Sequence, residues 1–293
     1  MANSKPWRSL LKTVAKLAIS GFFLYMVFRK IDYRDLLFQM RHTALWWVLP
    51  ALFLFVLSKW ISSIRLNLFF NSIGLHLGEK ENLRLYWLGM FYNMFLPGGI
   101  GGDGYKIYLL NRKFQSPAKR LFWAVFLDRV SGLGALLFLC ALLVVFIFPN
   151  TRIILSIMGI LILACIAYYF IYKKYFPSFM GCFWRTNFQG LLVQIAQVIC
   201  ACCIMKALHI ETHYPEYILL FLISSVVAIF PFTMGGLGAR ELSFVYGSEY
   251  LMLNQQSSVI ISFWFYLITL VVSLAGIIYV FRSPFENGKA TSK

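Results

Sequence analysis

The chain has 293 residues, of which 60% are hydrophobic and only 13% are charged. An ordinary soluble domain carries about 25% charged residues, and a soluble fold of this size cannot cover so much apolar side chain. The composition therefore excludes an ordinary soluble protein and predicts an all-α integral membrane protein.

Six apolar runs are long enough to cross a membrane, since a spanning helix needs roughly 20 mostly apolar residues. In chain order they cover residues 10–28, 45–65, 121–148, 152–172, 188–208 and 257–281. The first run begins with Lys12 and Lys16 and lacks a clear cleavage site, so we expect a retained helix rather than a signal peptide. No polar stretch is long enough to fold alone, which predicts a single transmembrane domain over residues 1–293.

Two further apolar segments, residues 85–112 and 216–253, are each interrupted by a glycine cluster. The sequence Gly-Gly-Ile-Gly at 98–101 matches Gly-Gly-Leu-Gly at 235–238, an offset of 137 residues. The flanking runs repeat in the same order, so residues 10–148 and 152–281 are predicted to be two structural repeats. Each repeat consists of two helices, one glycine-broken segment and one further helix.

The basic residues favour one of two topologies. If each broken segment is a re-entrant hairpin and the N-terminus is inside, 18 of the 27 Lys and Arg lie on the cytoplasmic side and seven lie outside. If each segment crosses, the protein has eight spanning helices and the split is 12 to 11. The positive-inside rule favours the first alternative, which gives six spanning helices, two hairpins and two inverted repeats. Both termini then lie in the cytoplasm. We expect the protein in the cell (inner) membrane.

The net charge of +16 does not indicate nucleic-acid binding. The basic residues lie at helix ends and in short loops, as expected for helix orientation and contact with anionic lipid head groups. The six cysteines and the pair His209 and His213 lack the spacing of metal ligands, so no metal and no cofactor are predicted.

The glycine clusters are the predicted substrate site. Unshielded backbone N–H groups and the positive end of the following helix form a receptor for phosphate or carboxylate. The alternative is that the glycines only allow close packing of helices. Charged residues within the membrane are costly and are retained where they pair or face a cavity. Asp128 and Arg129 can form a local pair, and Lys59 and Arg65 can extend to the inner surface.

Three short blocks resemble the flippase-like membrane family that includes the N-terminal membrane half of lysylphosphatidylglycerol synthase. They are Asn93 to Asp103 with Lys106, Ser116-Pro117-Ala118 leading to Asp128-Arg129 and Gly132, and Pro231 to Glu241. Met234 stands where many members have proline. The resemblance implies movement of an anionic or aminoacylated lipid, or of a polyprenyl-linked amphiphile, between leaflets. Only about a dozen residues follow the last run, so we do not expect the synthase activity.

On this basis we expect two groups of site residues. The substrate-binding residues are Arg129, Arg240, Lys106, Gly98, Gly99, Gly101, Gly235, Gly236 and Gly238. The residues that orient these cations or couple a proton are Asp103, Asp128 and Glu241, and Asn93 is expected to satisfy backbone at a broken helix.

Two other function classes remain open at this point. The chain can be a non-transporting membrane partner of a lipid-modifying enzyme or glycosyltransferase. It can also be a membrane enzyme acting on a lipid-linked substrate, for which Asp103 and Glu241 are the one pair of carboxylates available. We favour a transporter over an enzyme, because the sequence contains no catalytic triad and no P-loop.

Overall fold

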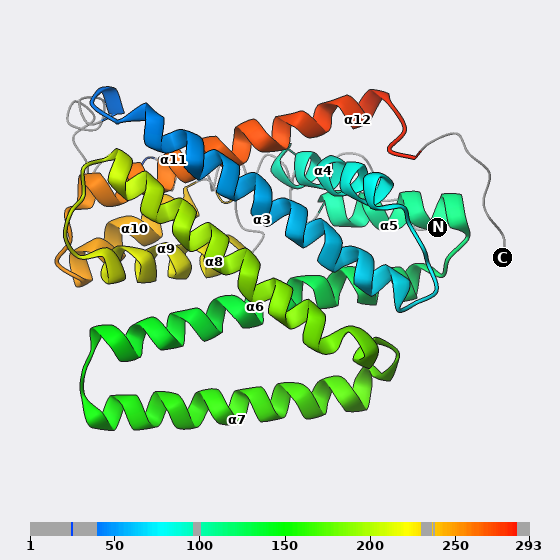
Figure 1. The fold of residues 1–293 in the computed structure, drawn as a ribbon, viewed down its shortest axis with the longest axis horizontal. Coiled ribbons are helices and arrows are strands. Elements are labelled where there is room, and N and C mark those ends of the chain that lie inside the picture. The colour runs from blue at the N-terminus through cyan, green and yellow to red at the C-terminus, as the bar shows by residue number, and fades with distance from the viewer. Residues whose placement is uncertain (1–24, 26–39, 96–100, 230–235, 237, 286–293) are drawn as a thin grey trace.

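The computed structural model describes Tyr25 and residues 40–95, 101–229, 236 and 238–285. These residues form helices joined by short loops (Figure 1). The α-helices are α3 (Leu45–Asn71), α4 (Glu79–Phe95), α5 (Gly101–Phe114), α6 (Ala118–Ile147), α7 (Thr151–Tyr175), α8 (Phe183–Ala207), α9 (Tyr214–Ile229), α10 (Ala239–Tyr250), α11 (Gln255–Leu274) and α12 (Ile278–Phe281). Two 3₁₀ helices, η1 (Pro177–Cys182) and η2 (Ala275–Ile277), lead directly into α8 and α12.

Five helical segments among the described residues are long and apolar enough to cross a membrane. They are Leu45–Asn71, Ala118–Ile147, Thr151–Tyr175, Pro177–Ala207 and Gln255–Phe281. These segments overlap five of the six runs that the sequence predicts, although Pro177–Ala207 begins 11 residues before the predicted run 188–208. The sixth run, residues 10–28, lies outside the described residues apart from Tyr25.

Each glycine-broken segment consists of two short helices. In the first segment α4 packs along α5, and in the second α9 packs along α10. The α4–α5 hairpin lies at the end of the molecule where α3 ends and α6 begins, on the right in Figure 1. The α9–α10 hairpin lies at the opposite end, where α8 ends and α11 begins (Figure 1).

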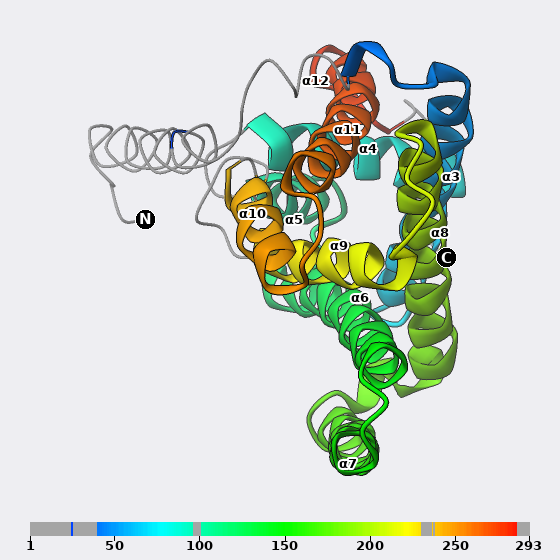
Figure 2. The same ribbon diagram turned by 90° about the vertical axis from the view of Figure 1, so that its left-hand side faces the viewer.

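Helices α3 and α8 pack side by side along most of their length (Figure 1) and lie along one side of the molecule in Figure 2. Two clusters of buried apolar side chains lie along this pair. One includes Phe55, Phe221 and Phe265, and the other includes Phe69 and Phe183. Burial of such aromatic side chains holds the long helices and both hairpins together.

Helix α7 is set apart from the rest of the molecule (Figure 2). Tyr172 is its one buried residue, and Leu155, Ile160 and Leu163 are each about two-thirds exposed. An apolar helix of 25 residues with this exposure fits a lipid environment, because contact of its apolar side chains with lipid chains is favourable and contact with water is not.

Two glycines allow the helices around α4 to approach closely. A Cβ atom on Gly102 would overlap the carbonyl oxygen of Gly89, and a Cβ atom on Gly276 would overlap the carbonyl oxygen of Trp87. Because both obstacles are backbone atoms, they cannot turn aside as a side chain does. The absence of a side chain at Gly102 thus sets the spacing of α4 and α5, and at Gly276 it sets the spacing of α4 and η2.

Candidate functional site

Asp103 is the centre of a buried charge cluster in the first hairpin. Its carboxylate accepts a hydrogen bond from Lys106 Nζ at 3.2 Å and forms an ion pair with Arg129 of α6. Asp103 is 5% exposed and Lys106 is 4% exposed, so neither charge is solvated by water. Both are stabilised by their neighbours instead, as buried charges require.

Asn93, near the end of α4, joins the two helices of this hairpin. Its side-chain oxygen accepts a hydrogen bond of 2.8 Å from the backbone N–H of Gly102, in the first turn of α5. First-turn N–H groups have no partner within their own helix. The Asn93 side chain thus satisfies backbone at the broken helix.

Asp128 and Arg129 do not pair with each other. Arg65 Nε of α3 donates to Asp128 Oδ1 at 2.7 Å, whereas Arg129 reaches Asp103 of α5. The local Asp128–Arg129 pair that the sequence left open is therefore not the one formed, because consecutive residues of a helix point in directions about 100° apart. Arg65 is only 5% exposed and does not extend to the surface. It pairs with the buried carboxylate of Asp128 instead.

The second hairpin satisfies its own helix start. Glu241 is 4% exposed. One of its carboxylate oxygens accepts a 2.7 Å hydrogen bond from the N–H of Gly238, and the other accepts a 3.0 Å hydrogen bond from Ser262 Oγ. The N–H of Gly238 was expected to face a ligand, and it donates to Glu241 instead. The Glu241 carboxylate takes the place of an external anion at the start of α10.

Arg240 lies against aromatic rings. Its guanidinium is 4.4 Å from the centre of the Phe265 ring and 5.4 Å from that of Phe221, and it donates to Ser225 Oγ at 2.6 Å. Its Nε is buried without a hydrogen-bond partner. Cation–π contacts stabilise a desolvated guanidinium, but they leave this donor unsatisfied.

A cavity of about 170 Å³ lies between α3, α4, α6, α8 and the end of α9. Three cations line it, namely Lys59, Arg65 and Arg129, together with the polar side chains of Ser62, Tyr86, Gln194 and Gln197. Arg65 Nη1 and Gln194 Oε1 are buried without a hydrogen-bond partner. The Lys59 ammonium lies 4.6 Å from the centre of the Phe55 ring, and no carboxylate among the described residues forms an ion pair with it.

The remaining predicted residues lie near this cavity, at the starts of α5 and α10, or outside the described ranges. Lys106 is placed next to it, since its ammonium is 4.6 Å from the centre of the Tyr86 ring. Gly101 and Gly238 lie at the starts of α5 and α10, and Gly236 precedes α10 with φ of +83°. Gly98, Gly99 and Gly235 lie outside the described residues. Within the described part of the chain, no three His, Cys, Asp or Glu side chains are grouped to hold a metal ion.

The family model of the lysylphosphatidylglycerol synthase TM region matches residues 13–276. The chain belongs to this family. It is a multi-pass helical membrane protein related to lipid-modifying proteins. A comparison with curated proteins found no match.

The match covers both hairpins and every residue that lines the 170 Å³ cavity. Sequence reasoning missed Gln194 and Gln197 of α8, which stand three residues apart and therefore on one helix face. Two glutamines on one face of an apolar run are a signal of a polar cavity, because an amide in lipid needs a partner. The sequence favoured the inner membrane surface for Arg65, because a residue near the end of an apolar run can lie either within the membrane or at its surface.

Proposed function

We propose that this protein is a flippase-like transporter that moves an amphiphile with an anionic, phosphate-bearing head group between the leaflets of the cell membrane. The observation that carries the proposal is the cation-lined cavity beside the two broken helices. Arg65 Nη1 is buried without a hydrogen-bond partner, and Lys59 has no carboxylate partner among the described residues. Such cations favour an anion, because a ligand that supplies acceptors removes a desolvation penalty.

The charges around the cavity do not balance. Among the described residues the group holds five cations, Lys59, Arg65, Lys106, Arg129 and Arg240, and three carboxylates, Asp103, Asp128 and Glu241. The undescribed tip residues 96–100, 230–235 and 237 contain no charged side chain. Among the described residues, two formal positive charges are therefore uncompensated, which matches a head group with one or two negative charges.

An aminoacylated head group fits less well. It carries an ammonium group, which needs a carboxylate or several neutral acceptors. Asp103 and Asp128 are engaged by Lys106, Arg129 and Arg65, and Glu241 is engaged by the start of α10. The same engagement removes both carboxylates of the acid–base pair considered above, so we propose no catalytic role for Asp103 or Glu241.

The hairpins are proposed to be re-entrant. A helix rises 1.5 Å per residue, so the 12 residues of α10 extend about 18 Å and the 17 residues of α4 about 26 Å. Both are shorter than the roughly 30 Å hydrocarbon core. Hairpins that enter from opposite ends are the arrangement expected of inverted repeats, in which substrate sites lie near the midplane. Rocking of one repeat against the other would open the cavity to each leaflet in turn.

The test is leaflet exchange of labelled lipids in liposomes that contain the purified protein. We expect the wild type to accelerate exchange of a phosphate-bearing anionic lipid, and we expect Arg129→Gln and Lys59→Gln to abolish most of this activity. Arg152→Gln is the matched control, since Arg152 is an exposed cation at the start of α7. Equal exchange by the wild type and both cavity variants, in folded protein, would contradict the proposal.

A second candidate function is a non-transporting partner that anchors a lipid-modifying enzyme or glycosyltransferase. The exposure of α7 favours it, because a 25-residue apolar helix with one buried residue offers a surface for another membrane protein. A wild-type protein that is folded, moves no lipid and co-purifies with such an enzyme in a stable ratio would support this alternative.

A further inference from the structure

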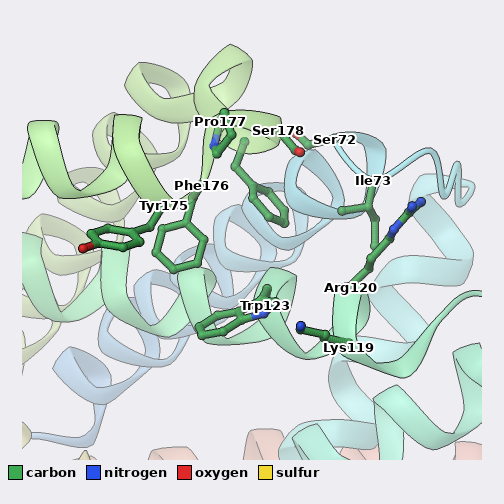
Figure 3. Close-up of a pocket in the computed structure, with 10 residues that line it drawn as sticks. Ser72, Ile73, Lys119, Arg120, Trp123, Tyr175, Phe176, Pro177 and Ser178 are labelled. Atoms are coloured by element: carbon green, nitrogen blue, oxygen red, sulfur yellow. The ribbon is translucent and has the colours of Figure 1, made fainter.

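A second, larger cavity lies at the end of the molecule where α3 and α7 end and α6 begins (Figure 3). Its volume is about 600 Å³, within the range of pockets that hold small molecules. Helices α3, α6 and α7 are all candidate spans. The junction of their ends therefore lies at the level of a membrane surface, where lipid head groups are found.

The lining of this cavity has a basic part and an aromatic part. Lys119 and Arg120 come from the first turn of α6, and no carboxylate among the described residues forms an ion pair with either. Trp123 lies one turn further along α6 and meets Phe176 edge-to-face, with ring centres 5.1 Å apart. Figure 3 shows Trp123 next to Lys119, with the rings of Phe176 and Tyr175 on the side away from Arg120.

Such a lining suits a phospholipid better than a soluble anion. Two cations with no ion-pair partner at the membrane surface attract a phosphate. Aromatic rings next to them can cover the glycerol and the first methylenes of an acyl chain. The hydroxyls of Ser72 and Ser178 also line the cavity and can bind the polar atoms of a head group.

We propose that this cavity binds one anionic phospholipid, with the phosphodiester at Lys119 and Arg120 and the glycerol region against Trp123 and Phe176. The site is separate from the 170 Å³ cavity. No described residue lines both cavities, and Lys119, Arg120 and Trp123 precede Arg129 and Leu133 on α6 by about ten residues, which is about 15 Å along the helix axis. The bound lipid is therefore retained and is not the transported molecule, and the proposal does not rest on the transport function.

The test is native mass spectrometry of the purified full chain with phosphatidylglycerol added, compared with phosphatidylcholine of the same acyl chains. We expect one phosphatidylglycerol to be retained, and we expect Lys119→Gln/Arg120→Gln to weaken its binding by about tenfold or more, given about 1 kcal/mol per basic residue near an anionic lipid. Lys173→Gln/Arg185→Gln is the matched control. It removes two exposed cations from the same end of the molecule that do not line the cavity.

Three results would overturn the proposal. Equal loss of lipid in both double variants would mean that binding follows the charge of the surface rather than this cavity. Equal retention of phosphatidylcholine and phosphatidylglycerol would mean that the anion is not recognised. Displacement of the lipid by glycerol 3-phosphate, which has no acyl chain, would assign the cavity to a soluble phosphate compound. Thermal unfolding of each variant checks that it is folded.

Discussion

Gly102→Ala provides a direct test of how α4 and α5 are held together. The added methyl group would overlap the carbonyl oxygen of Gly89 and would lie 2.9 Å from Asn93 Oδ1. A backbone carbonyl cannot move without its helix, so the two helices must separate. Overpacking of this kind costs about 1–3 kcal/mol. The hydrogen bond from Gly102 to Asn93 is strained at the same time, which adds about 1 kcal/mol.

Gly104→Ala is the control, because it is the same change in the same helix with no atom within 4 Å of the new Cβ. The gain in helix propensity, up to about 1 kcal/mol, is largely shared by the two variants. Their difference in free energy of unfolding thus isolates the overlap. We expect Gly102→Ala to be less stable than Gly104→Ala by about 2–4 kcal/mol. Denaturant unfolding in detergent micelles, followed by tryptophan fluorescence, measures this difference. Equal stability of the two variants would refute the close approach of α4 and α5.

Two further predictions concern buried carboxylates. Arg65→Met should destabilise the protein by about 3–5 kcal/mol, because it leaves Asp128 buried without its cation. The double variant Arg65→Met/Asp128→Leu should recover much of that loss. The pairing is wrong if the double variant unfolds as readily as the single one. Glu241→Gln should cost about 1–2 kcal/mol, since the amide can still accept from the Gly238 N–H and donate to the Ser262 hydroxyl, but the negative charge at the start of α10 is lost. Unfolding of the exposed control Glu211→Gln should match the wild type, and equal stability of both glutamine variants would count against the helix-capping role.

The positions of the long helices could be predicted from sequence because the cause is local. A run of about 20 apolar residues is sufficient to specify a spanning helix, and the run at 121–148 became α6 with a shift of one to three residues at its ends. The break between α4 and α5 could be predicted for a similar reason, since Pro97 and the two adjacent glycines that follow it disfavour a continuous helix.

The partners of the buried charges could not be predicted, because they depend on how distant helices pack. Arg65 and Asp128 are 63 residues apart, and Asp103 and Arg129 are 26 residues apart. Composition and spacing give the depth of a charged residue but not the direction it faces. For Glu241 the sequence predicted a cation or a proton as partner, whereas the structure provides the start of its own helix and Ser262.

Asp128 and Arg129 link α6 to two different elements, and the two links differ in a way that bears on the proposed transport. The Arg65–Asp128 pair joins α6 to α3, and its side chains are only 6% and 11% exposed. Arg129 joins α6 to the first hairpin, and its side chain is 34% exposed although Asp103 is buried. An incoming phosphate can reach Arg129 and compete with Asp103 for it, while Lys106 still compensates Asp103. The buried pair would then hold α3 and α6 as one body, and the exchangeable pair would release α4–α5 when the substrate binds.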